Sequence, residues 1–346
     1  MSAGKKISVI IPCFNEEKFI VQLIENLLGQ DYPKDLLEII FADGKSTDKT
    51  RDLIDGYARR FGFIKLIDNP QRLVPFALNK AILASSGEVI IRMDAHSVYP
   101  INYLSILVEK LFGHKAENVG GVWITIPGND TRRAKAIVLA TTHPLGIGNA
   151  DYRLGAPGDK EVDTVPYGCF HRDLFGRIGY FDEHMFRNQD DELNGRIRKV
   201  GGKIILIPSL KIRYYARENF SKLWKMFYQY GLFKPLVNMK LGAPASIRQF
   251  APPVFVLGIC ILVIASLFST TAFYLFSAMI AIYVTAITIV SISQASLRDP
   301  VLVINTMAAF PVIHFAYGLG YIFGLVKFTM LHHHLRMKPH HIKENR

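Results

Sequence analysis

Three groups of acidic residues could carry chemistry, and one of them directly follows an apolar stretch. Residues 89–93 (VIIRM) lead into Asp94, Ala95 and His96. A carboxylate and an imidazole two positions apart can meet one divalent cation, which would neutralise the charge that develops on a departing diphosphate. The D-x-H spacing also arises by chance, so this pattern alone is a weak signal.

A second apolar run, Leu37 to Ala42, leads into the polar sequence DGKSTD at residues 43–48. A carboxylate at the carboxyl end of a strand, here Asp43, can accept hydrogen bonds from a nucleotide base or ribose. A Ser or Thr of the same sequence would then cap the next helix. The alternative is that both aspartates serve only as turn and cap residues.

The densest acidic cluster, Asp190, Asp191 and Glu192, stands at the start of a helical pattern. The helix dipole favours negative charge in a first turn, which explains part of the cluster without any function. The functional interpretation is that one of the three carboxylates deprotonates an acceptor hydroxyl as a general base. Both interpretations stay open at this point.

The elements that position these groups alternate as strand and helix. Ile7 to Pro12 and Leu37 to Ala42 are continuous apolar runs separated by a helical pattern from Glu16 to Leu28, which predicts a βαβ unit of buried parallel strands. Further strands are expected at residues 63–67, 89–93, 119–125 and 203–208, and helices at 47–61, 76–85, 101–112 and 190–200. The predicted fold class is α/β, with a doubly wound, mostly parallel sheet that binds ligands beyond its carboxyl edge.

The composition separates this part of the chain from a membrane region. Hydrophobic residues make up 50% of the chain and the mean hydropathy is +0.19, which is too apolar for an ordinary soluble protein of 346 residues. From residue 250 to 326 only Arg298 and Asp299 interrupt an apolar stretch. Three segments there approach or exceed the ~20 residues that cross a bilayer. The prediction is a domain at residues 1–217 and a transmembrane region at 250–326.

Between these two parts, residues 218–249 alternate aromatic side chains with Lys. The mixture predicts an interfacial amphipathic segment in which Trp224, Phe227 and Tyr228 anchor at the headgroups of membrane lipids. The alternative is a helix that packs against the α/β domain.

The basic, His-rich tail at residues 327–346 bears on the number of crossings. Three full crossings would place it opposite the N-terminal domain, against the tendency of Lys and Arg to stay cytoplasmic. Pro311 and His314 interrupt the third apolar segment, so a broken or re-entrant helix is expected there. The five histidines of the tail favour a mobile segment over a metal site.

Charge and cysteine usage narrow the partners and the compartment. The 41 Lys and Arg against 29 Asp and Glu give a net charge of +12, which suits anionic lipids or a polyphosphate substrate. The chain lacks zinc-finger and RNP-type signatures, so no nucleic acid partner is expected. Cys13, Cys169 and Cys260 imply no disulfide framework, and the first apolar run is too short for a signal-peptide core. The N-terminal domain is therefore expected in the cytoplasm, at the inner membrane.

The order of motifs resembles a known family. PCFNEE, ADGKSTD, MDAH, GCFHRDLFGRIGYFDE and NQDDELNGR follow one another as in the GT-A fold of family 2 glycosyltransferases, and most closely as in the succinoglycan-biosynthesis glucosyltransferases. The resemblance covers about residues 7–230. PCFNEE also lacks the G-x-G-x-x-G pattern, which argues against a Rossmann dinucleotide site.

The resemblance implies a role for each matching residue. Pro12, Asn15, Glu17, Asp43 and Asp94 would bind the nucleotide of a nucleotide-sugar donor. Asp94 and His96 would hold a divalent cation, Asp190 would be the general base, and the acceptor side would be formed by Gly168, His171, Asp182, Glu183, Asp191 and Glu192.

Two departures from the family pattern affect these expectations. His96 replaces the second carboxylate of the D-x-D motif, and a nitrogen ligand favours Mn²⁺ over Mg²⁺, although either remains an expected cation. Gln189 replaces the acid that usually precedes the base, while Asp190 itself is present. The chain also lacks Q-x-x-R-W, which disfavours a processive synthase.

The expected function is a membrane-bound, inverting transfer of a single sugar to a lipid-linked or polysaccharide acceptor in the synthesis of cell-surface or exopolysaccharide. One alternative is a polyprenyl-phosphate sugar synthase, whose phosphate acceptor needs little deprotonation. A second is a non-catalytic membrane scaffold that retains the fold, which His96 and Gln189 would suggest.

Overall fold

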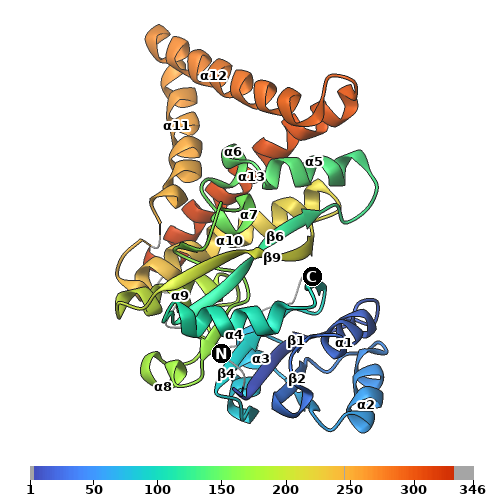
Figure 1. The fold of residues 1–346 in the computed structure, drawn as a ribbon. Helices are drawn as coiled ribbons and strands as arrows, with labels where there is room; N and C mark the ends of the chain where they lie inside the picture. Colours follow the sequence, from blue (N-terminus) through green and yellow to red (C-terminus); the bar gives the residue numbers. More distant parts are fainter. Residues whose placement is uncertain (1–3, 245, 331–346) are drawn as a thin grey trace. The chain divides into compact units, whose positions relative to one another are not determined.

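The computed structural model describes residues 4–244 and 246–330, which form two compact units (Figure 1). The first, here called the sheet unit, contains residues 4–124 and 155–214. The second, the helical unit, contains residues 125–154 and 215–330. The segment 125–154 therefore packs with the helices, although it interrupts the sheet unit in sequence.

Half of the sheet is parallel and follows the apolar runs of the sequence. Its strands lie in the order β3-β2-β1-β4, namely β3 (Ile64–Asp68), β2 (Leu37–Asp43), β1 (Ile7–Cys13) and β4 (Val89–Arg92). The helices of this part are α1 (Ile20–Leu28), α2 (Thr50–Arg60), α3 (Val74–Ala84) and α4 (Tyr103–Gly113), with a 3-10 turn, η1, at Lys34–Leu36. Every residue of β1, β2 and β4 is buried, as continuous β-branched runs predict for parallel strands.

The other half of the sheet is antiparallel, which corrects the expectation of a mostly parallel sheet. Its strands are β8 (Cys169–His171), β6 (Asn118–Ile126), β9 (Ile204–Tyr215), β5 (Ser97–Val98) and β7 (Lys160–Glu161). β8 pairs antiparallel with both β4 and β6. It spans three residues and begins after Tyr167 and Gly168, which both have positive φ. Such a short strand shows no periodicity that a sequence pattern could reveal.

The remaining helices of the sheet unit are α8 (Leu174–Ile178) and α9 (Gln189–Lys199). α9 begins after Asn188, whose φ is 59°, so the chain turns sharply just before the acidic cluster. This turn places Asp190, Asp191 and Glu192 in the first turn of the helix.

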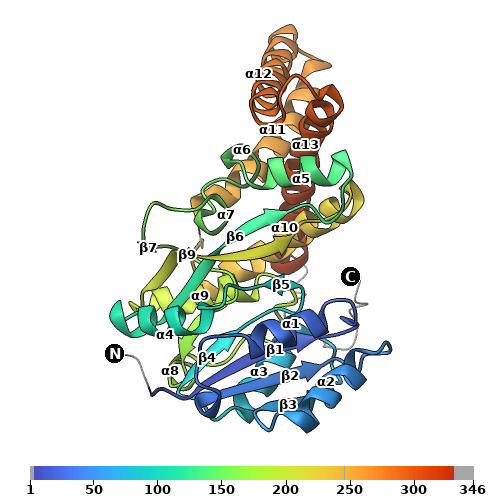
Figure 2. The same cartoon turned by 45° about the vertical axis from the view of Figure 1, so that its right-hand side comes forward.

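The helical unit contains α5 (Arg132–Thr141), α6 (Pro144–Ile147), α7 (Asp151–Leu154), α10 (Phe220–Leu241), α11 (Ala251–Ser266), α12 (Thr270–Ala295) and α13 (Pro300–Leu325), with a 3-10 turn, η2, at Ile247–Phe250 and a π-helical end, η3, at Val326–Met330. In the described residues, three helical stretches are long and apolar enough to cross a membrane: Ile247–Ser266, Thr270–Ala295 and Pro300–Thr329. Figure 2 shows α5 and α10 lying against α13, which agrees with their packing contacts.

α13 is continuous, which corrects the expectation of a break at Pro311 and His314. The helix runs through both residues without interruption. A proline removes one backbone donor, and packing from neighbouring helices allows an apolar helix to tolerate that loss. The histidines of the tail, at residues 332–341, lie outside the described residues.

Candidate active site

A buried arginine joins two of the acidic groups. Arg92 ends β4 with only 4% of its surface exposed. Its Nη1 donates to Oδ1 of Asp190 at the start of α9, and its Nη2 lies 3.4 Å from Oδ1 of Asp94. Burial lowers the pKa of the guanidinium, but the two carboxylates raise it by more, so Arg92 stays cationic. The two candidate carboxylates therefore share one counter-charge.

Each of these carboxylates contacts Arg92 through Oδ1 and has a second oxygen, Oδ2. Side-chain exposure is 21% for Asp94 and 29% for Asp190. Within the described part of the chain, Oδ2 of either residue accepts no hydrogen bond. Burial raises the pKa of Asp190, and Arg92 opposes this rise, while the charges of Asp94 and Asp191 add to it. A carboxylate with a raised pKa and an unengaged oxygen can accept a proton near neutral pH.

Three further side chains hold this arrangement, and the sequence analysis did not single them out. The Tyr99 hydroxyl accepts a hydrogen bond from the backbone amide of Asp94 at 2.8 Å. The guanidinium of Arg92 lies 5.7 Å from the ring centroid of Tyr167, whose hydroxyl is 2.9 Å from that of Ser97. Burial raises the pKa of both tyrosines, so their hydroxyls remain neutral.

The sequence alone could have identified Arg92 as a candidate site residue. A cation at the end of an apolar, buried strand needs a carboxylate partner, because an isolated buried charge is very costly. The sequence IIRMD therefore carried the signal, although it did not identify Asp190 as the partner.

Asp43 lies at the same edge of the sheet. β1 pairs with β2 on one side and β4 on the other, with Cys13 opposite Asp43 and Ile10 opposite Arg92. Asp43 is completely buried, and its carboxylate accepts hydrogen bonds from the Ser46 hydroxyl at 2.6 Å and from Arg51 at 3.1 Å. These contacts give Asp43 a definite role in the turn, beside any role in binding a base.

The loops after β1 and β2 are joined by reciprocal hydrogen bonds. Oδ1 of Asn15 accepts from the backbone amide of Thr47 at 2.8 Å, and the Asn15 amide donates to the Ser46 hydroxyl at 2.9 Å. Glu17 accepts from the amide of Lys49 at 3.1 Å. Asn15 has a φ of 55°, a conformation that asparagine adopts more readily than most residues. Pro12 pairs with Ala42 in the adjoining strands.

The donor set beside β4 fits a cation only in part. Nδ1 of His96 lies 3.7 Å from a carboxylate oxygen of Glu16, and Oδ2 of Asp94 is unengaged. Over residues 4–244 and 246–330, no group of three or more His, Cys, Asp or Glu side chains is arranged to hold a metal ion. One carboxylate and one imidazole suit Mn²⁺ when a bound diphosphate supplies further oxygen ligands.

The residues expected on the acceptor side separate into two places. The carbonyl of Gly168 accepts a hydrogen bond from the amide of Arg92 at 2.9 Å, so Gly168 lies beside the joined carboxylates. Its φ is 89°, and a Cβ there would lie 2.5 Å from the Phe170 ring. His171, by contrast, pairs with Val89 at the beginning of β4, and its ring packs on Phe112. The structure therefore does not bring His171 to the carboxyl edge.

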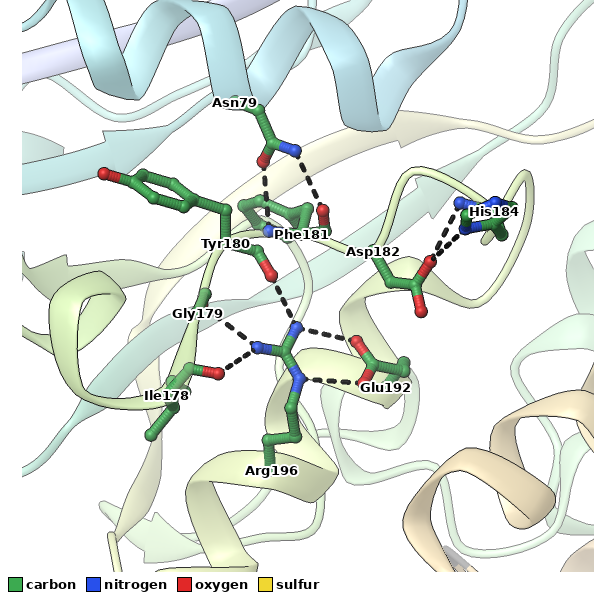
Figure 3. A network of polar contacts seen from close by, with 9 residues as sticks. All are labelled: Asn79, Ile178, Gly179, Tyr180, Phe181, Asp182, His184, Glu192 and Arg196. Atoms are coloured by element: carbon green, nitrogen blue, oxygen red, sulfur yellow. Dashed lines mark hydrogen bonds and ion pairs between the residues drawn. The ribbon is translucent and has the colours of Figure 1, made fainter. Parts of the chain in front are cut away.

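Glu192 has a structural partner that accounts for its whole carboxylate. Nε and Nη2 of Arg196 donate to its two oxygens at 2.8 and 2.7 Å (Figure 3). The same guanidinium donates to the carbonyls of Ile178, Gly179 and Tyr180. All five N–H groups of Arg196 are thus engaged, and Glu192 is 4% exposed. Asp191, one residue earlier, is only partly buried.

The segment that Arg196 binds is also held from α3. The side-chain amide of Asn79 exchanges two hydrogen bonds with the backbone of Phe181, at 2.8 and 3.0 Å (Figure 3). Asn79 also donates to Glu183 at 3.2 Å, while Asp182 accepts from the backbone amide of His184 at 2.9 Å. These bonds fix the position of α9, and with it Asp190, relative to the parallel strands.

A mixed sheet with an acidic carboxyl edge, and a helix that brings a further carboxylate to it, is the arrangement of the GT-A fold. A family model of glycosyl transferase family 2 matches residues 8–179. The chain is 30% identical over 246 residues to the succinoglycan biosynthesis protein ExoA of Rhizobium meliloti, covering 70% of this chain and 73% of that protein. The chain belongs to glycosyl transferase family 2.

Two further likenesses extend over nearly the whole chain. A dolichyl N-acetyl-alpha-D-glucosaminyl phosphate 3-beta-D-2,3-diacetamido-2,3-dideoxy-beta-D-glucuronosyltransferase of Methanococcus voltae is 30% identical over 330 residues, covering 93% of this chain and 97% of that enzyme. The solved mannosyltransferase PcManGT of Pyrobaculum calidifontis, in complex with GDP-Man and Mn²⁺, has a TM-score of 0.57 at 19% identity and covers 94% of this chain and 88% of its own. This structural likeness supports the fold, including the C-terminal helices.

Proposed function

We propose that this glycosyltransferase moves one sugar from a nucleotide-sugar donor to a lipid-linked or polysaccharide acceptor, with inversion at the anomeric carbon. The observation that carries the proposal is the Arg92 contact with Asp94 and Asp190. It brings a candidate ligand of the cation, Asp94, next to a candidate general base, Asp190. The named substrates of the Methanococcus relative, a lipid-linked sugar among them, support this acceptor class.

In the proposed mechanism, Asp190 accepts the proton of the acceptor hydroxyl through Oδ2 while Arg92 holds its other oxygen. Asp94 and His96 would hold a divalent cation, which neutralises charge on the departing diphosphate when bound. The Mn²⁺ in the PcManGT complex supports this choice of cation. Asn15, Glu17 and Asp43 would shape the nucleotide side, and Gly168 the opposite side of Arg92.

The test uses full-length protein in detergent with a panel of nucleotide sugars and Mn²⁺ or Mg²⁺, and measures acceptor-dependent release of nucleoside diphosphate. Asp190→Asn should keep donor affinity and lose about 10² to 10⁴ in kcat, the usual contribution of a general base. Asp173→Asn is a matched control, because this aspartate is 76% exposed and forms a weak ion pair with Arg177 at 3.9 Å.

Asp94→Asn should instead weaken donor binding in the presence of the cation, measured by calorimetry with and without Mn²⁺. Equal donor affinities of the unsubstituted protein and of Asp94→Asn, each with and without Mn²⁺, would exclude Asp94 as a cation ligand. Full activity of Asp190→Asn, together with transfer to a polyprenyl phosphate, would favour the polyprenyl-phosphate sugar synthase. Nucleotide binding without transfer under any cation would favour the non-catalytic scaffold.

A further inference from the structure

α13 is apolar enough to span a bilayer, yet other helices cover much of its surface. Half of its apolar stretch is buried within the protein, against 17% for Ile247–Ser266 and 11% for α12. A spanning helix at the edge of a protein normally presents most of its surface to lipid. What covers α13 therefore decides where this helix can lie.

The first half of α13 contacts α5 and α6. Asp299, which caps α13, accepts two 3.0 Å hydrogen bonds from Nε of Arg132. His314 lies in the middle of α13. Its Nε2 is 2.8 Å from the carbonyl oxygen of Leu145, and its Nδ1 is 2.8 Å from the Tyr283 hydroxyl. Because a carbonyl only accepts, Nε2 carries the proton and Tyr283 donates to Nδ1. α6 is thus hydrogen-bonded directly to the middle of α13.

The second half of α13 contacts α10 backbone to backbone. A Cβ on Gly320 would lie 2.2 Å from the carbonyl oxygen of Tyr228, and one on Gly324 would lie 2.3 Å from that of Leu232. On the α10 side, a Cβ on Gly231 would lie 2.1 Å from the carbonyl oxygen of Tyr317. No lipid chain fits between helices at this separation. The contact between Phe233 and Phe328, with ring centroids 5.7 Å apart, continues the interface to the end of the helix.

Two of the helices that pack on α13, α5 and α10, carry exposed basic side chains, each paired with a carboxylate. Side-chain exposure is 59% for Arg132 and 47% for Lys135 on α5, and 54% for Lys222 on α10. A Lys or Arg at the bilayer centre costs about 2.5–3.5 kcal/mol on insertion scales. If α13 crossed the bilayer, α10, which packs along its second half, would enter it as well and carry Lys222 with it. At headgroup depth the same cations are favourable, because the cytoplasmic leaflet is anionic.

α11 and α12 have the opposite character. Residues 249–297 contain no Asp, Glu, Lys or Arg, and Arg248 and Arg298 bound this stretch on either side. Phe255 and Tyr283 lie about equally far from the turn between the two helices, and their ring centroids are 4.7 Å apart. α11 and the first half of α12 therefore pack on each other around an uncharged turn, as a membrane-inserted helical pair does.

We propose that the chain crosses the bilayer twice, through α11 and α12, and that α13 lies with α5 and α10 at the level of anionic lipid headgroups. Both ends of the inserted pair are then on one side of the bilayer. The described chain then ends, at Met330, on that side too, so the expected conflict with the distribution of Lys and Arg disappears.

The test is labelling of single cysteines by a membrane-impermeant maleimide in sealed proteoliposomes. The background replaces the exposed Cys260 by Ser and retains Cys13 and Cys169, which are buried. The reporters are Arg59→Cys on the sheet unit, Phe268→Cys in the α11–α12 turn, Arg298→Cys in the α12–α13 turn, and Arg346→Cys. Molecules with an outward sheet unit are selected by an affinity tag at the N-terminus.

The proposal predicts that Arg59→Cys, Arg298→Cys and Arg346→Cys react together, while Phe268→Cys reacts only after detergent is added. Protection of Arg346→Cys alongside labelling of Arg298→Cys would overturn it, because α13 would then cross. Labelling of Phe268→Cys in sealed vesicles would also overturn it, because the helical pair would not cross. Trypsin cleavage at Arg336 or Lys338 of the unsubstituted chain reports the side of the tail independently, and none of these readouts requires catalytic turnover.

Discussion

Arg92 contacts one oxygen of Asp94 and one oxygen of Asp190 in the candidate active site. The second oxygen of Asp94 is proposed to bind the cation, and that of Asp190 to accept the proton. The arginine holds Oδ1 of both Asp94 and Asp190, so it sets their spacing and balances one of their two charges. Without it, two neighbouring carboxylates would repel each other, and one of them would tend to bind a proton. Arg92 is therefore proposed as a positioning residue that keeps Asp190 available as a base.

A double-mutant cycle tests this role. Arg92→Lys keeps the charge but loses the fork that reaches both carboxylates. Loss of one hydrogen bond to a charged group should lower kcat about 10-fold or more in the Asp190 enzyme. In the Asp190→Asn background the same substitution should change the residual rate little, because its effect acts through Asp190. Equal losses in both backgrounds would indicate a general structural effect. Arg177→Lys is the control, because this arginine is half-exposed and pairs with Glu117 and Asp173, away from the joined carboxylates.

Glu38 predicts a pH dependence of stability that is separate from catalysis. Burial raises the pKa of this carboxylate, but hydrogen bonds from Lys65, Ser8 and Ser86 outweigh burial and lower the pKa from 4.5 to about 2. A lowered folded-state pKa stabilises the protein above pH 4.5, and this contribution is lost as the pH falls towards 2.

The shift corresponds to about 3 kcal/mol at neutral pH. Glu38→Gln should therefore lower the thermal midpoint at pH 7 and have less than half that effect at pH 3, measured by circular dichroism in detergent. Asp55→Asn, which removes an exposed ion pair with Arg59, should change the midpoint little at either pH.

At the scale of elements, the position of α9 depends on one guanidinium. Arg196 uses its five N–H groups to join the first turn of α9 to the segment that Asn79 holds from α3. Lysine has a single amine and cannot reproduce this planar fork. With lysine at position 196, the first turn of α9, which carries Asp190, would no longer be held at a fixed distance from β4.

Arg196→Lys should lower the free energy of unfolding by about 2 kcal/mol, through unsatisfied carbonyls and the loss of hydrogen bonds to Glu192. It should also reduce kcat more than donor affinity, because the displaced group is the base. Arg59→Lys is a matched control, since Arg59 likewise pairs with a carboxylate four residues earlier but is 79% exposed. A similar loss of stability and kcat in both variants would show that the planar fork of Arg196 is not the cause of the effect.

The parallel half of the sheet could be predicted because its strands are continuous apolar runs with turn residues after them. Asp43 and Asp94 were found for the same reason, since each follows such a run. β8 could not be predicted, because three residues cannot show a period. The salt bridge between Arg92 and Asp190 joins residues 98 positions apart, and no local pattern in the sequence encodes such a pairing.

At the scale of the whole molecule, the close approach of α10 and α13 makes their glycines sensitive to any added carbon. Gly→Ala normally stabilises a helix by about 1 kcal/mol. At Gly320 the sign should reverse, because the new methyl group would lie 2.2 Å from a backbone oxygen of α10. Gly320→Ala should lower the thermal midpoint by a few degrees, whereas Gly258→Ala on α11, where nothing lies within 4 Å, should not. A raised midpoint for Gly320→Ala would contradict the packing.

The sequence correctly indicated long apolar helices but could not show which of them lipid surrounds. Hydropathy measures what a helix is made of, whereas exposure to lipid depends on what packs against it. The basic helix α5 comes from the segment 125–154, more than a hundred residues before α13 in the chain, so their association is visible only in three dimensions.

The fully engaged guanidinium of Arg196 also offers a spectroscopic probe. Arginine side-chain protons usually exchange with solvent and rotate too fast to give separate signals, but these hydrogen bonds should slow both processes. In protein labelled with ¹⁵N-arginine, the terminal NH₂ groups of Arg196 should give resolved resonances at room temperature. A donor analogue that shifts those resonances would show that donor binding changes the surroundings of Arg196 at the first turn of α9, without any mutation of the enzyme.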